Sequence, residues 1–143
     1  MLRFSLTQFE SIVAHCQSRY PKEACGVLAG KRQPPVGAAG DVVAVYPMKN
    51  VEDSPIGYSM DPKEQLQVEK QMRGKQQRLL GIYHSHTASD AYPSPVDVRL
   101  AISPDISYVL VSLKNQAKPV LKSYRIEGAH VLPEDAIIED APC

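Results

Sequence analysis

Several features that would restrict the function of this chain are scarce or missing. Its three cysteines, Cys16, Cys25 and Cys143, are far apart and include no C-x-x-C pair. An odd, scattered set does not favour a disulfide framework and agrees with a reducing compartment. No run approaches the roughly 20 apolar residues of a membrane span, and the N-terminus lacks the apolar core of a signal peptide. We therefore expect a cytoplasmic protein without a membrane partner.

The chain also lacks an excess of charge of either sign. It has 16 Lys and Arg residues against 16 Asp and Glu residues. Binding to nucleic acid needs a surplus of Lys and Arg on one face, so no nucleic-acid partner is expected. A length of 143 residues with 43% hydrophobic residues fits one domain with a single core. Nothing in the sequence determines the oligomeric state.

The hydrophobic pattern changes repeatedly between strand and helix periods. Strands are expected at 2–4, 24–29, 42–48, 58–60, 78–86, 106–113 and 120–126. Helices are expected at about 7–20, 62–73 and 94–102. Thr7 and Glu10 have the spacing of a capping box for the first helix, and Asp61 is the expected N-cap of the second. From Pro133 on, the chain is acidic and is expected to be loose. This order predicts an α+β domain, with helices on a curved, mostly antiparallel sheet.

Two histidines stand at the end of an expected strand. His84 and His86 are two residues apart, so both imidazoles point to the same face and can share a metal ion. A catalytic zinc site needs a third protein ligand and keeps one position open for water. Asp97, at the start of the next helix, is the best candidate for that ligand.

Each of these residues also has a simpler interpretation. Two histidines at a strand end are often exposed or hydrogen-bonded residues. Ser94, Pro95 and Asp97 make a good helix start, with the serine as N-cap, so Asp97 can be a capping residue. One carboxylate can do both, since it can order the turn and face a metal. Glu23, taken alone, is a surface carboxylate at a helix end.

The complete pattern is more specific than its parts. His84 begins the string H-x-H-x7-S-x2-D, and Glu23 begins EACGVLAG. Together they resemble the JAMM signature of the MPN-domain metallopeptidases, over nearly the whole of residues 2–126. The stretch IYHSHTASDAYPSPVD is very similar to the bacterial Mec-type members. Many JAMM proteins have proline after the second histidine, where this chain, like Mec-type members, has Thr87.

This resemblance implies a fold, a cofactor and residue roles. The fold would be a single MPN domain with a cytidine-deaminase-like topology over residues 1–130, and 131–143 would be a short C-terminal tail. One Zn²⁺ per chain would be held by His84, His86 and Asp97. Glu23 would act as the general base, and Ser94 would hydrogen-bond the developing oxyanion.

The resemblance also implies a substrate. Mec-type enzymes release cysteine or a short extension from the C-terminus of a ubiquitin-fold sulfur carrier with a Gly-Gly tail. A thin tail suits an extended peptide laid along a sheet edge, for which residues 51–60 are a candidate. Deubiquitinase-like relatives split an isopeptide bond at lysine instead and carry longer insertions. Another alternative is an MPN scaffold without catalysis, which typically lacks the ligands found here. A zinc nucleobase deaminase is disfavoured, because the H-x-E and P-C-x-x-C elements are absent.

Overall fold

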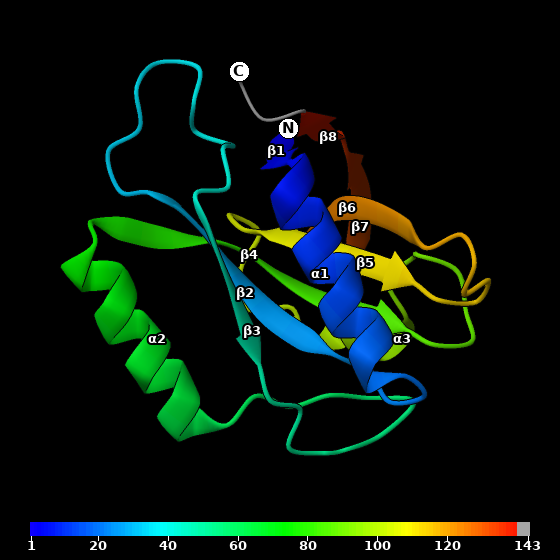
Figure 1. Ribbon diagram of the computed structural model, residues 1–143. Coiled ribbons are helices and arrows are strands. Elements are labelled where there is room, and N and C mark those ends of the chain that lie inside the picture. Colours follow the sequence, from blue (N-terminus) through cyan, green and yellow to red (C-terminus); the bar gives the residue numbers. More distant parts are fainter. Residues whose placement is uncertain (140–143) are drawn as a thin grey trace.

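The structure, a computed structural model, describes residues 1–139 (Figure 1). The helices are α1 (Leu6–Arg19), α2 (Pro62–Gly74) and α3 (Pro95–Arg99). The strands are β1 (Leu2–Ser5), β2 (Cys25–Lys31), β3 (Ala44–Met48), β4 (Gln77–His86), β5 (Ser107–Ser112), β6 (Val120–Glu127), β7 (His130–Glu134) and β8 (Ala136–Glu139). Six strands form a sheet in the order β3-β2-β4-β5-β6-β7, and β1 pairs with β8 in a second, two-stranded sheet.

The large sheet is mostly antiparallel, as the sequence predicted. Its one parallel pair among the described strands is β4 with β5, which α3 and its flanking loops connect. A parallel pair needs such a crossover, because its strands cannot be joined by a tight turn. This crossover brings the N-terminus of α3 beside the end of β4. The fold class is therefore α+β, as expected.

The two long helices cover opposite faces of the sheet. Ile12 and Cys16 of α1 pack with Leu28 of β2 in one buried cluster. Val68 of α2 packs with Val27 of the same strand in another. Because adjacent residues of a strand point to opposite faces, the two clusters lie on different sides of β2. Both faces are buried, which explains why 25–30 is an almost continuous apolar run.

The starting point of α1 differs from the sequence prediction. Ser5, the last residue of β1, is the N-cap in place of Thr7. Its Oγ accepts a hydrogen bond from the Gln8 backbone N–H at 3.1 Å, and Gln8 Oε1 accepts one from the Ser5 N–H at 2.9 Å. This is the same reciprocal box, formed two residues earlier. The T-x-x-E prediction was wrong because Ser5 and Gln8 already form the capping box, and the helix begins before Thr7.

Three further expectations need correction. Residues 58–60 form no strand, only an isolated bridge between Asn50 and Met60. The third helix ends at Arg99, short of residue 102. The loose tail expected from Pro133 is wrong for residues 133–139, because β7 pairs with β6 and β8 pairs with β1. Residues 140–143, with Cys143, lie outside the described part. The domain limits of 1–130 stay a prediction.

Candidate metal centre

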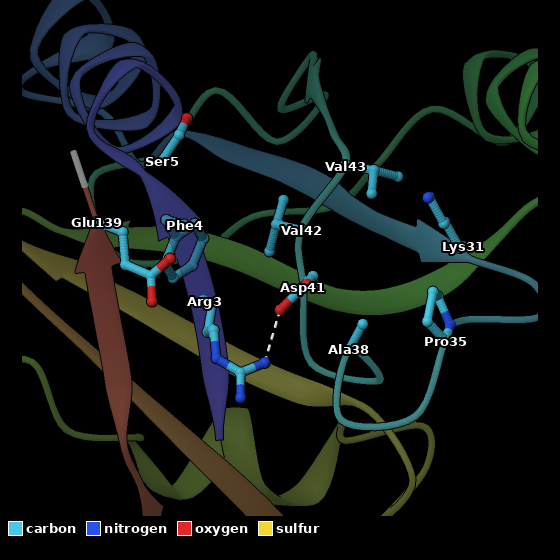
Figure 2. Close-up of a pocket in the computed structure, with 10 residues that line it drawn as sticks. All are labelled: Arg3, Phe4, Ser5, Lys31, Pro35, Ala38, Asp41, Val42, Val43 and Glu139. Atoms are coloured by element: carbon cyan, nitrogen blue, oxygen red, sulfur yellow. Dashed lines mark hydrogen bonds and ion pairs between the residues drawn. The ribbon is translucent and has the colours of Figure 1, made fainter. Parts of the chain in front are cut away.

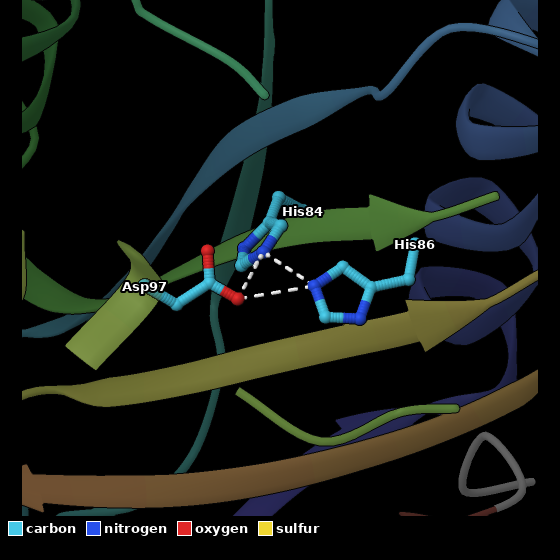
Figure 3. A group of neighbouring side chains, drawn as sticks. All are labelled: His84, His86 and Asp97. Carbon is cyan, nitrogen blue, oxygen red and sulfur yellow. Dashed lines mark hydrogen bonds and ion pairs between the residues drawn. The ribbon is translucent and has the colours of Figure 1, made fainter. Parts of the chain in front are cut away.

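Three side chains with metal-binding atoms meet at the end of β4. The Nε2 atoms of His84 and His86 lie 3.3 Å apart. Asp97 Oδ2 lies 3.2 Å from His84 Nε2 and 3.0 Å from His86 Nε2. Figure 3 shows the two rings and the carboxylate turned towards one another. One ligand atom from each residue lies within 4.8 Å of the others, which is the donor set of a three-ligand site with an open position.

Strand alternation places the two histidines. His84 and His86 share the face of β4 that carries Ile82, which packs against the α2 cluster. Tyr83, which precedes His84, and Ser85, which lies between the two histidines, are fully buried on the other face. A polar pair on an inner face is unusual, since buried polar groups need partners. Both histidines are nearly inaccessible, at 4% and 5% exposure, so they are not the exposed surface residues of the simpler interpretation.

The start of α3 places the third side chain. Ser94 is the N-cap, and its Oγ accepts a hydrogen bond from the Asp97 N–H at 3.1 Å. The Ser94 N–H donates in return to Asp97 Oδ2 at 2.9 Å. The same carboxylate oxygen therefore completes the capping box and faces both imidazoles. Asp97 has the capping role and the position of a ligand at once.

A backbone carbonyl fixes the orientation of one imidazole. His86 Nδ1 lies 2.9 Å from the carbonyl oxygen of Asp90. A carbonyl oxygen only accepts, so Nδ1 carries the hydrogen and Nε2 of the neutral ring presents a lone pair. That lone pair points at Asp97 Oδ2, another acceptor. Two acceptors at 3.0 Å repel unless a proton or a cation lies between them, so the donor set fits a metal ion.

Burial and mutual contact shift the pKa values of the cluster. Burial lowers the pKa of His84, which favours the neutral, metal-binding ring. For His86, burial is outweighed by the hydrogen bonds with Asp97 and the Asp90 carbonyl, and its pKa is raised. Burial opposes the charge on Asp97, yet the two imidazoles hold the pKa of its carboxyl below the usual range. The cluster thus combines an anionic carboxylate with a neutral imidazole.

Glu23 shares a cavity with this cluster. The cavity has a volume of about 390 Å³, and its wall includes Glu23, His86, Ser94 and Asp97. Glu23 lies just before β2 and is 6% exposed. Burial raises the pKa of its carboxyl to about 7, against an ordinary value of 4.5. A carboxylate that titrates near neutrality is suited to accept a proton and return it.

A second cavity, also of about 390 Å³, lies on the His84 side of the cluster. Tyr58, Asp97 and Leu100 line both cavities. Apolar side chains such as Ile82 make up much of the second wall. The three side chains therefore have open space on both sides.

Some residues around the centre could not be found from sequence patterns. The Tyr58 ring stacks on His84, with centroids 4.6 Å apart and planes at 29°. Asp90 contributes only a backbone carbonyl, which no residue pattern reveals. Asn50 lies in a turn-rich stretch, where asparagine is normally exposed, yet it is 2% exposed.

Another cavity, of about 380 Å³, lies among β1, β8 and the loop after β2 (Figure 2). Two of its charged side chains, Arg3 and Asp41, form an ion pair with each other. Arg3 Nη1 donates to Asp41 Oδ1 at 2.7 Å and to the Gly37 carbonyl at 2.9 Å. The titratable groups that meet at the end of β4 lie elsewhere. This cavity therefore offers no comparable chemistry.

Comparisons with known proteins agree with the fold. The family described as prokaryotic homologs of the JAB domain matches residues 6–127. The CysO-cysteine peptidase of Mycobacterium tuberculosis (strain H37Rv) is 45% identical over 124 residues, covering 87% of this chain and 82% of that protein. The desampylase of Haloferax volcanii is 33% identical over 108 residues, covering 72% of this chain and 74% of that protein.

A known structure extends the likeness over the whole chain. A protein of Desulfitobacterium hafniense, studied in solution, has a TM-score of 0.86 at 40% identity and covers 99% of this chain and 94% of its own. This chain therefore belongs to the JAB family, and the resemblance expected from the motifs is confirmed. None of the helices in residues 1–139 has the length and hydropathy to cross a membrane.

Proposed function

We propose that this chain is a zinc metallopeptidase that hydrolyses the bond after the C-terminal Gly-Gly of a ubiquitin-fold sulfur-carrier or modifier protein. The convergence of His84, His86 and Asp97 beside the cavity that Glu23 also lines carries the proposal. The relatives named CysO-cysteine peptidase and desampylase support the substrate class. A scaffold without catalysis does not require a complete ligand set beside a buried carboxylate.

The donor set suits zinc. Two imidazoles and one carboxylate are borderline and hard ligands that catalytic zinc sites combine with an open position. The carbonyl of Asp90 orients one imidazole, as outer contacts do for metal-binding histidines. Bound zinc lowers the pKa of its water towards neutrality and polarises the scissile carbonyl. One ion per chain is expected.

Two residues of the chain handle protons and charge. Glu23 takes the proton of the attacking water and passes it to the leaving amine, which its raised pKa favours. Ser94 Oγ accepts from the Asp97 N–H and keeps its own hydrogen to donate. That hydrogen is the donor for the oxyanion that develops on the substrate carbonyl. The N-cap and catalytic roles of Ser94 are therefore compatible.

Mass spectrometry of a carrier protein tests this function. The substrate is a ubiquitin-fold sulfur carrier that ends in Gly-Gly followed by cysteine, incubated with the zinc-loaded chain. We expect a product that ends at Gly-Gly, and no product with Glu23→Gln. If carriers with single-residue and short extensions all keep their mass beside the zinc-loaded chain, the proposed function is wrong.

An isopeptidase is the second candidate, favoured by the 33% identity to a desampylase. The same carrier joined to a lysine side chain separates the two. We expect faster release of the linear extension, because the identity to the CysO-cysteine peptidase, 45%, exceeds the 33% identity to the desampylase. Preferential cleavage of the lysine conjugate would reverse this order. The carrier and the residue released are identified by the same experiment.

A further inference from the structure

One buried side chain organises the loop between β3 and α2. Asn50 is 2% exposed, and four hydrogen bonds use both ends of its amide. Its Nδ2 donates to the carbonyl oxygens of Glu23 and Gly57, each at 3.0 Å. Its Oδ1 accepts from the backbone N–H groups of Glu52 and Ser59, each at 3.0 Å. The side chain therefore shapes the loop and fastens it to Glu23.

Glu23 is bound to this loop through both of its peptide groups. Its N–H donates to the Ser54 carbonyl at 2.8 Å, and its carbonyl accepts from Asn50. The residue itself lies in neither α1 nor β2, so regular secondary structure does not fix its backbone. Side-chain direction follows backbone conformation. These two bonds therefore help set where the carboxylate enters the cavity.

The same loop is a wall of the cavity. The loop residues that line it are Glu52, Pro55, Ile56, Gly57 and Tyr58. From the opposite wall, Thr87 Oγ1 donates to the Pro55 carbonyl at 3.1 Å. A peptide in the cavity therefore contacts the segment that holds the Glu23 backbone.

We propose that Asn50 is a positioning residue that couples the loop of residues 50–59 to the carboxylate of Glu23. The inference rests on the proposed function, since it needs Glu23 to transfer a proton. Asn50 acts through the backbone of Glu23 and does not touch the reacting atoms. A misplacement of about 1 Å in a catalytic group lowers the rate roughly a hundredfold, which sets the expected effect.

Two substitutions remove the donated bonds in different ways. Asn50→Asp keeps the accepting oxygen and loses the two donors, and Asn50→Ser leaves one donor on a shorter side chain without adding charge. Asn115→Asp is the matched control, because Asn115 Oδ1 also accepts a backbone N–H, that of Ala117 at 3.1 Å, in an exposed turn. We expect both Asn50 variants to lose about a hundredfold in kcat, with full zinc content and KM within about a factor of two. We expect the control to match the wild type.

If the loop only bound substrate, substitution of Asn50 would raise KM and leave kcat unchanged. Unchanged kcat with a raised KM in the Asn50 variants would overturn the proposal. A loss in Asn50→Asp alone would also overturn it, since added charge and not position would then be the cause. If the wild-type chain fails to cleave carriers, the proposed function falls, and the hydrogen-exchange measurement described below still tests the contact between Asn50 and Glu23.

A double-mutant cycle tests whether Asn50 acts through Glu23. In the Glu23→Gln background, we expect Asn50→Ser to lower the remaining rate by less than about twofold, because the pair acts as a unit. A further hundredfold loss would show that Asn50 serves some other group. If the residual rate is too low to follow, the exchange measurement decides.

Hydrogen exchange of the metal-free chain gives a readout independent of activity. The Glu23 amide donates to Ser54, and the Ser85 amide donates to Ala24 inside the sheet region at 3.0 Å. We expect Asn50→Ser to speed exchange at Glu23 and leave Ser85 unchanged. Equal acceleration at both amides would indicate general loss of stability and would contradict the coupling. An unprotected Glu23 amide in the wild type would contradict it directly, even where neither variant folds.

Discussion

Two carboxylates with little exposed surface, Glu134 at 6% and Asp97 at 15% of the side chain, face different kinds of partner. Glu134 accepts hydrogen bonds from Ser107 Oγ at 2.6 Å, Ser123 Oγ at 2.7 Å and Arg125 Nε at 3.0 Å. Each of these three partners donates a hydrogen, and together with Glu134 they form what we call the Glu134 cluster. Asp97 instead faces two imidazole nitrogens, and that of His86 presents a lone pair when the ring is neutral.

The difference separates a structural carboxylate from a candidate metal ligand. In the Glu134 cluster, the hydroxyl and guanidinium donors compensate the buried charge, so nothing further is needed. The Asp97 cluster, made of His84, His86 and Asp97, gathers acceptors and borders two cavities. A set of neutral imidazoles that converges on a carboxylate beside open space fits a cation. Burial alone does not indicate a metal site, and the kind of partner that the carboxylate faces is the more informative feature.

Removing the metal is expected to have the largest effect. Bound zinc contributes several kcal/mol to the reaction, so a chelator should lower carrier cleavage about a thousandfold or more. Added zinc should restore the wild type but not a His84→Ala, His86→Ala double variant. Cleavage rates before and after dialysis measure this. Full activity in the double variant would show that His84 and His86 hold no catalytic metal, and the Asp97 cluster would then not differ from the Glu134 cluster in this respect.

The next largest effect is expected at the general base. Glu23→Gln keeps size and leaves the three ligands intact but removes proton transfer. We expect turnover to fall roughly a hundredfold or more, with unchanged zinc content. Steady-state kinetics and elemental analysis on one preparation check both. A near wild-type rate would show that Glu23 is not the general base.

Substitutions of Ser94, at the edge of the Asp97 cluster, can separate its role as helix N-cap from its proposed role in catalysis. Ser94→Ala should cost about 1 kcal/mol of unfolding free energy by loss of the cap. Ser94→Asn caps well but puts no hydroxyl at the same point, so we expect stability and zinc to be kept while turnover falls roughly a hundredfold. Thermal unfolding and cleavage rates measure the two effects. An active, stable Asn variant would show that Ser94 serves only the helix.

The smallest effect concerns the Glu134 cluster and its pH dependence. Burial opposes the charge, but the bonds from Ser107, Ser123 and Arg125 outweigh it and lower the pKa of Glu134. A lowered folded pKa gives stability that is present above the unfolded value and is lost as pH falls through the folded value. Glu134→Gln should therefore cost about 1–3 kcal/mol at neutral pH, and the difference from wild type should shrink as the solution is acidified.

Urea unfolding from about pH 7 down to about pH 3 measures this difference, in the range where a lowered carboxyl pKa has its effect. Carrier cleavage at neutral pH is the companion readout and should be unchanged. If the difference in unfolding free energy between the wild type and Glu134→Gln grows on acidification, the pKa of Glu134 is not lowered in the folded state. Loss of zinc in Glu134→Gln would show that the two clusters are not independent.

Local patterns predicted the parts of the fold nearest the site. Strand period placed His84 and His86 on one face, and the S-x-x-D spacing anticipated the cap between Ser94 and Asp97. These features depend on neighbours within a few residues, which a single sequence displays. The residue roles stay predictions until the metal and the rates are measured.

Contacts between distant segments were not predictable in the same way. The pairing of β1 with β8 joins residues more than a hundred positions apart, so an acidic stretch beginning at Pro133 gave no local sign of it. The hydrogen bond from Ser107 to Glu134 likewise joins β5 to β7, which are not adjacent strands of the sheet. Asn50 carries no pattern that distinguishes a buried amide from an exposed turn residue. Such contacts follow from the assembled sheet and not from local propensity.

Zinc content shows whether the Asp97 cluster, and not the Glu134 cluster, binds a metal ion. Elemental analysis is made on the purified wild type, Asp97→Asn and Glu134→Gln after identical dialysis. We expect close to one equivalent in the wild type and Glu134→Gln, and far less than one in Asp97→Asn, since zinc needs the third anionic ligand. A full equivalent in Asp97→Asn, or a wild-type chain that binds no zinc, would contradict the account.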